Sequence, residues 1–157
     1  MMKPRSIVFG LMLGLALPWS LSGCAGIDVL HASAQCPGGQ SREVRLTQDP
    51  LEYARLWRGI GASPVATPVP DLAGRRALYL ADNEHPTAGY AMTLASPVLK
   101  TQLGVASLSI RTERPEGMAA QVVTRPCLLL ALPAGDYERV EVRDQDGREW
   151  GTASLVK

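Results

Sequence analysis

A series of short apolar segments separated by turn residues constrains the fold of this chain more than any other feature. The run 127–132 is entirely apolar, which is typical of a strand buried on both faces of a sheet. Residues 77–81 are also mostly apolar, whereas 103–112 and 137–142 alternate apolar with polar side chains. The pattern predicts a mainly β fold, an antiparallel β-sandwich or open barrel of seven or eight short strands. The other expected strands are 42–46, 89–94 and 149–156.

One helix is expected to pack on this sheet structure, and it follows Asp49. Asp49 is a good N-cap residue, Pro50 suits the first helical position, and Glu52 completes a capping box. Apolar side chains then recur at helical spacing until glycines end the pattern. The apolar stripe consists of Tyr53, Leu56, Trp57 and Ile60.

The amino-terminal segment has the pattern of an export signal. Two basic residues precede the apolar run 7–17, which is too short to span a bilayer stably, and small residues follow it. The sequence Leu-Ser-Gly-Cys at 21–24 resembles the bacterial lipobox. This resemblance implies that 1–23 is a lipoprotein signal peptide and that Cys24 becomes the acylated first residue, anchored in a membrane. A plain signal peptide with an incidental cysteine is the alternative.

The mature chain is expected to be one domain held at the cell envelope. Residue 25 is alanine rather than aspartate, and the resemblance to sorted lipoproteins therefore implies the outer membrane, facing the periplasm. We expect a lipidated leader at 24–40 and a single β-rich domain at 41–157, because this length suits one core. Loss of the two basic signal residues changes the formal net charge from +1 to −1. With no polybasic stretch, membrane contact is expected through the lipid, and nucleic acid is not an expected partner.

Cys36 and Cys127 are the other cysteines of the mature chain. An exported protein with one such pair is expected to form a disulfide between them. Two buried free thiols are the alternative. A metal site is not expected, because no histidine or further cysteine stands at ligand spacing along the chain.

No arrangement of residues in the sequence demands catalysis. His31 lies in the expected leader and His85 in a loop, and neither a nucleophile-elbow serine nor a glycine-rich phosphate loop is present. The acidic turn 144–147 lacks the bidentate glutamate of a calcium loop, and a hairpin turn explains it. We therefore expect no catalytic residue, no cofactor and no enzyme activity.

One polar turn between two apolar strands is the candidate site for a protein partner. Proline and glycine stiffen this turn, and a stiff loop lowers the ordering cost of binding. A turn that only connects two strands is the alternative. The candidate contact residues are His85, Pro86, Thr87, Gly89 and Tyr90.

Five short motifs between residues 71 and 144 occur in the order found in one known family. They are the strand 75–80, the turn 86–90, Arg-Pro at 114–115, Thr-Arg-Pro-Cys-Leu at 124–128 and Leu-Pro at 132–133. With this set, the segment resembles the carboxy-terminal domain of PrcB-type protease-complex subunits. The resemblance implies an exported, lipid-anchored accessory subunit that binds and stabilises an exported protease or other envelope protein. It implies no catalytic residues, and it leaves the leader with Cys36 unexplained.

The turn 86–90 also resembles a loop of the chagasin-type inhibitors of cysteine peptidases, which are small β-sandwich proteins. Arg-Pro at 125–126 would stand for their Arg-Pro-aromatic loop, although Cys127 replaces the aromatic residue. Their glycine-rich middle loop has no counterpart at 115–118. The expected function is therefore that of the accessory subunit, with a chagasin-like inhibitor as the alternative.

Overall fold

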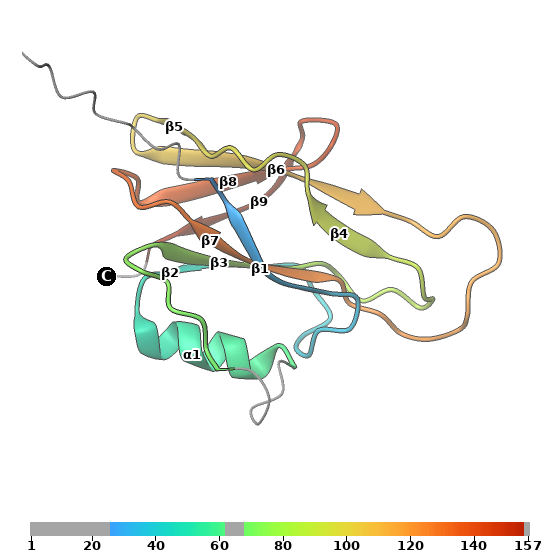
Figure 1. Cartoon of the computed structure of the whole chain (residues 1–157). Coiled ribbons are helices and arrows are strands. Elements are labelled where there is room, and N and C mark those ends of the chain that lie inside the picture. Colours follow the sequence, from blue (N-terminus) through green and yellow to red (C-terminus); the bar gives the residue numbers. More distant parts are fainter. Residues whose placement is uncertain (1–25, 62–67, 156–157) are drawn as a thin grey trace, which may run out of the picture.

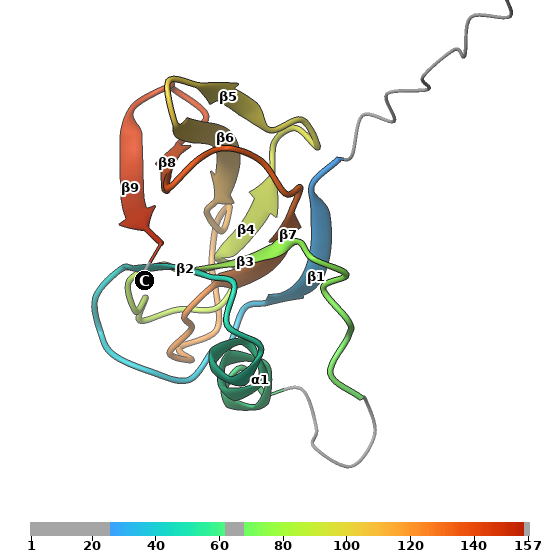
Figure 2. The same ribbon diagram turned by 90° about the vertical axis from the view of Figure 1, so that its left-hand side faces the viewer.

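The computed structural model describes residues 26–61 and 68–155, where the chain forms two facing sheets and one helix. The elements are β1 (Asp28–Ser33), β2 (Glu43–Thr47), α1 (Pro50–Gly59), β3 (Arg76–Ala81), β4 (Ala91–Leu94), β5 (Lys100–Gln102), β6 (Val105–Glu113), β7 (Cys127–Leu132), β8 (Arg139–Arg143) and β9 (Glu149–Ser154). Helix α1 covers the outer face of one sheet (Figure 1), and Figure 2 shows the second sheet on that sheet's other side. The predicted β-sandwich with one packed helix is confirmed.

The two sheets differ in their strand directions. The sheet next to α1 has the order β1-β7-β3-β2, and all its pairs are antiparallel. The second sheet has the order β4-β6-β8-β9, with β5 also paired to β6. Here β6 and β8 run parallel, which differs from the predicted antiparallel arrangement. Their directions agree because the chain crosses to the other sheet and runs through β7 before it returns as β8.

Strand β7 lies between two hydrophobic clusters, which explains why its sequence is apolar throughout. Its neighbours β1 and β3 cover both of its edges. One set of alternate side chains fills the interior of the sandwich, and the other set faces α1. The interior set is Leu128, Leu130 and Leu132, and the set that faces α1 is Cys127, Leu129 and Ala131.

Helix α1 begins as the sequence predicts, with one difference in its cap. The side chain of Asp49 accepts a hydrogen bond of 2.9 Å from the backbone N–H of Leu51. In the predicted capping box, the side chain of Glu52 accepts a hydrogen bond from the backbone N–H of Asp49. In the structure this N–H donates instead to Oγ1 of Thr47 at 3.1 Å. The buried face of the helix carries Tyr53, Leu56 and Trp57.

The Asp49→Ala variant should be less stable than the wild type by about 1 kcal/mol, because a backbone donor of the first helical turn loses its acceptor. The change is measured as a shift of the urea midpoint at constant slope. Asp49→Ser keeps a capping oxygen and should restore most of the loss. Equal stability of the alanine and wild-type proteins would contradict this account of the helix start.

The expected domain boundary at residue 41 is corrected, because β1 in the expected leader is an edge strand paired with β7. A register shift between Val29 and His31 breaks the alternation by which a strand is recognised in sequence. Strand β5 consists of three exposed polar residues, so it also lacks the alternation of apolar and polar side chains that predicts a strand. Residues 89 and 90 were expected in a strand, but β4 begins at Ala91.

A disulfide joins Cys36, in the loop after β1, to Cys127, the first residue of β7. The two Cα atoms lie 6.0 Å apart, within the range of ordinary disulfides. The predicted pairing is therefore confirmed. The sequence separation is 91 residues, and closing a loop of this size restricts the unfolded chain by about 4–5 kcal/mol in the entropic model.

The predicted signal peptide 1–23 and the predicted lipidation site Cys24 lie outside the described residues. The first described residues lead directly into β1, and just before this strand the N–H of Ile27 donates to the carbonyl of Pro97 at 2.8 Å. In the part of the chain that is described, no helix has the length and apolar character needed to cross a membrane.

Candidate functional site

The predicted binding loop 85–90 lies beside a second loop, 115–123, and we call the two together the tip surface. The first loop joins β3 to β4, and the second belongs to the connection from β6 to β7. Both loops lie at the end of the molecule opposite the start of β1 (Figure 1). Two segments that are distant in sequence therefore form one surface.

Hydrogen bonds hold the two loops of the tip surface in place. The N–H of His85 donates to the carbonyl of Thr124 at 2.8 Å, and the N–H of Thr124 donates back at 2.9 Å. The Thr124 hydroxyl donates to the carbonyl of Thr87 at 2.8 Å. The N–H of Ala88 donates to the carbonyl of Ala120 at 2.9 Å. The loops are thus ordered before any partner binds, which lowers the entropic cost of binding.

Several of the predicted contact residues support the loop from within. The rings of His85 and Tyr90 stack with centroids 3.8 Å apart, and Nε2 of His85 lies 3.2 Å from Oδ2 of Asp82. Gly89 has a φ of +92°, and a Cβ atom there would lie 2.7 Å from Cβ of Pro115. Only glycine satisfies both conditions without strain. His85, Gly89 and Tyr90 therefore shape the loop and are poor probes of a direct contact.

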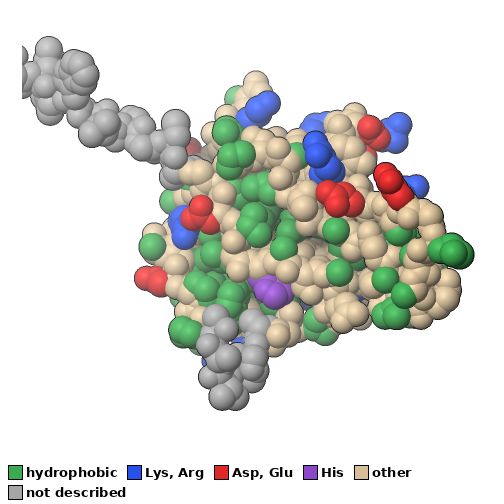
Figure 3. All heavy atoms as spheres, turned by 45° about the vertical axis from the view of Figure 1, so that its right-hand side comes forward, with side chains coloured by type: hydrophobic (Ala, Val, Ile, Leu, Met, Phe, Trp, Pro, Cys, Tyr) green, Lys and Arg blue, Asp and Glu red, His purple; other side chains and the backbone are tan. Residues whose placement is uncertain are grey.

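The second loop carries the apolar side chains that are exposed at the tip surface. Met118 is fully exposed, and the residues Val122 and Val123 are 45% and 62% exposed. Figure 3 turns this end toward the viewer and shows hydrophobic side chains on the surface at the right-hand edge. Exposed apolar groups on an ordered loop are typical of protein contact sites. Nothing in the sequence distinguishes these residues, because 118–123 resembles an ordinary link into the next strand.

Arg125, which the inhibitor resemblance assigns to a binding loop, is buried with 3% of its surface exposed. Its guanidinium donates to the carbonyls of Pro37, Ser41 and Asp82 at 2.8, 3.0 and 3.2 Å. One of its nitrogens also lies 3.3 Å from a carboxylate oxygen of Glu43. Arg125 thus ties three segments of the chain together and is not available to a partner.

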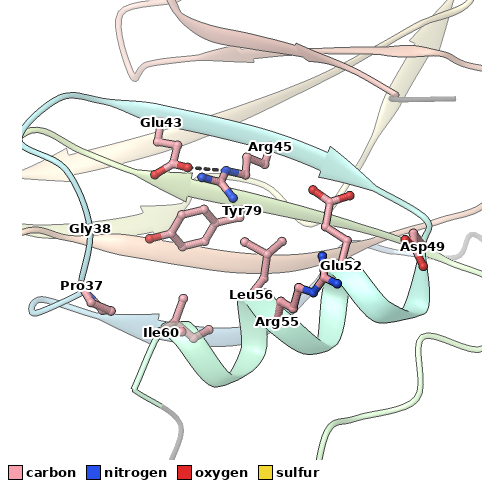
Figure 4. A pocket seen from close by; sticks show the side chains of 11 residues that line it. Pro37, Gly38, Glu43, Arg45, Asp49, Glu52, Arg55, Leu56, Ile60 and Tyr79 are labelled. Atoms are coloured by element: carbon pink, nitrogen blue, oxygen red, sulfur yellow. Dashed lines mark ion pairs between the residues drawn. The ribbon is translucent and has the colours of Figure 1, made fainter.

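A hollow with a volume of about 510 Å³ lies away from the tip surface, between α1 and the strands β2 and β3. Figure 4 shows Leu56 and Ile60 rising from the helix toward Tyr79 of β3, with charged side chains around the rim. The charged residues that line the pocket are Glu43, Arg45, Asp49, Glu52 and Arg55.

The groups in this pocket are largely engaged with one another. Glu43 pairs with Arg45 and with Arg125, while Asp49 caps the helix. Burial raises the pKa of Tyr79 above its ordinary value of 10.0, an effect that the nearby Arg125 partly offsets. The phenol therefore stays protonated at neutral pH and is unsuited to act as a base. The pocket therefore combines an apolar floor with charged groups that are mostly paired within the protein.

Known proteins do not add to this description of the site. No family model, curated protein or solved structure matches the chain.

Proposed function

We propose that this protein is a lipid-anchored accessory subunit of the cell envelope that acts by protein–protein contact and without catalysis. Its partner is an exported protease or another envelope protein, and the tip surface is the contact site. The observation that carries the proposal is an ordered pair of loops with Met118, Val122 and Val123 exposed on it.

The position of the tip surface also favours this role. In the proposed mature protein the lipid is attached to Cys24, four residues before β1 begins. The tip lies at the opposite end of the molecule (Figure 1). An anchor at the start of β1 would leave the tip free to reach a partner away from the bilayer.

The burial of Arg125 weighs against the chagasin-like alternative. Such an inhibitor would need the segment 125–126 as an exposed loop, but this arginine is held by backbone carbonyls inside the fold. The two functions also differ in their assays. An inhibitor would block a papain-like peptidase without covalent change, whereas an accessory subunit would co-purify with a specific exported protein.

Substitution of the exposed apolar residues tests the contact. In the anchored protein, Met118→Ser and Val123→Ser should each weaken binding to the co-purified partner by more than about 1 kcal/mol, roughly fivefold in affinity. Leu51→Ser is the matched control, because Leu51 is apolar and 69% exposed but lies on α1. All three variants should unfold at nearly the wild-type temperature, since exposed positions change stability little. Unchanged affinity in both tip variants, or equal loss in Leu51→Ser, would refute the proposed contact site.

A further inference from the structure

Three side chains that bear metal-ligand atoms meet where β1 lies against β7. A ring nitrogen of His31 and the sulfurs of Cys36 and Cys127 all lie within 4.8 Å of one another. His31 belongs to β1, Cys36 to the loop that follows, and Cys127 to the start of β7. The sequence alone does not indicate this group, because Cys127 lies 91 positions after Cys36.

The orientation of His31 depends on an irregularity in β1. His31 lies opposite Leu129, on the face of the sheet that also carries Cys127. A register shift between Val29 and His31 produces this pairing. Without the shift, His31 would lie opposite Leu128 and would point into the sandwich interior. The bulge thus turns the imidazole toward the two sulfurs, as bulges near functional sites do.

The imidazole of His31 has an unsatisfied nitrogen. Nε2 is buried and has no hydrogen-bond partner among residues 26–61 and 68–155. Buried polar atoms are nearly always paired, so an unpaired one calls for an explanation. The ring meets Trp57 edge-on with centroids 6.3 Å apart, a contact that restricts its orientation. A metal ion is a natural partner for a buried imidazole nitrogen beside two sulfurs.

We propose that reduction of the Cys36–Cys127 disulfide converts this group into a Zn²⁺ site. A dithiol reductant attacks Sγ of Cys36, and the sulfur of Cys127 leaves as a thiolate. The second thiol of the reductant then attacks the mixed disulfide, which frees Cys36 and leaves the reductant oxidised to its own disulfide. Cys36 is 7% exposed and lines a surface hollow of about 520 Å³, whereas Cys127 is fully buried, so Cys36 is the sulfur nearer to a reductant in solution.

Charge and ligand chemistry select the metal. Two thiolates and one neutral imidazole balance Zn²⁺ to a net charge of zero, whereas Cu⁺ would leave one negative charge. The surroundings are an apolar cluster with Tyr53, Trp57 and Leu129, where a net charge is costly. Zn²⁺ binds thiolate and imidazole together, and with three protein ligands it keeps one position for water. Binding releases the two thiol protons, so the site should weaken as the pH falls.

The test uses the full chain with Cys24→Ser, so that Cys36 and Cys127 are the remaining thiols. After reduction with a phosphine in the absence of oxygen, the protein should bind one equivalent of Zn²⁺, whereas the oxidised protein should bind none. Co²⁺ in place of Zn²⁺ should give the thiolate charge-transfer absorption of a two-sulfur site. His31→Ala should weaken Zn²⁺ binding at least ~10-fold, since loss of outer-shell partners alone costs that much.

His85→Ala is the matched control, because the chain has two histidines, and it should bind Zn²⁺ as the wild type does. Equal affinity of the His31→Ala and wild-type proteins would overturn the proposal, as would the absence of binding in the reduced protein. Zn²⁺ should also raise the unfolding temperature of the reduced wild type and not that of His31→Ala. A reduced chain that is unfolded and does not recover the native circular dichroism with Zn²⁺ would also overturn it.

Discussion

Replacing Cys24 by serine is expected to release the protein from the membrane. Each buried methylene of an acyl chain stabilises membrane binding by about 0.8 kcal/mol, and two or three chains give stable anchoring where one is marginal. Serine lacks the thiol that would carry the diacylglycerol. Fractionation of cells should therefore find the wild type in the outer membrane and Cys24→Ser in the soluble fraction. Intact mass should show acyl chains on residue 24 in the wild type alone.

Ser22→Ala is the control for this experiment, because it keeps a small residue ahead of the cysteine. It should remain in the membrane with the same acylated mass. A mature wild-type protein that has no added mass, or that begins at another residue, would contradict the predicted lipidation.

Arg125→Met is expected to destabilise the fold by about 3–5 kcal/mol. The side chain is buried, and its loss leaves the carbonyls of Pro37, Ser41 and Asp82 without their donor. Glu43 also loses one of its cationic partners. Methionine keeps much of the volume, so the effect reports the lost polar contacts. Urea unfolding followed by circular dichroism measures the difference.

Arg45→Met is the matched control for Arg125→Met. Arg45 pairs with the same carboxylate, but its side chain is 54% exposed. Solvent screens such a pair, and its removal should cost less than about 1 kcal/mol. If both variants lost the same stability, the buried network around Arg125 would not have the role described here.

The elements that the sequence predicts well are those whose burial is regular. The apolar run 127–132 matches β7, because both faces of this strand are covered. Asp49 marks the start of α1, because its capping hydrogen bond joins residues that are neighbours in the sequence. Strand β1 is not predicted because a register shift breaks its alternation, and β5 is not predicted because its three residues are polar and exposed. The parallel pair of β6 and β8 depends on the path of the chain between two sheets, which alternation does not encode.

The candidate site was predicted only in part, because its two loops meet through the tertiary fold. The turn 85–90 has a clear proline and glycine pattern, but nothing local places Ala120 or Thr124 beside it. The residues next to Met118 in the sequence do not indicate that its side chain is exposed. Its exposure depends on how the loop 115–123 is placed in the fold. The orientation of His31 follows from a register shift that only the pairing of β1 with β7 reveals.

Site-specific photo-crosslinking in intact cells tests directly whether the tip surface contacts a protein partner. A photoreactive residue at position 118 should give a discrete adduct with one exported protein, identified by mass spectrometry. The same residue at position 51, on the exposed side of α1, should give no such adduct. Absence of an adduct from position 118, or the same adducts from both positions, would contradict the proposed function.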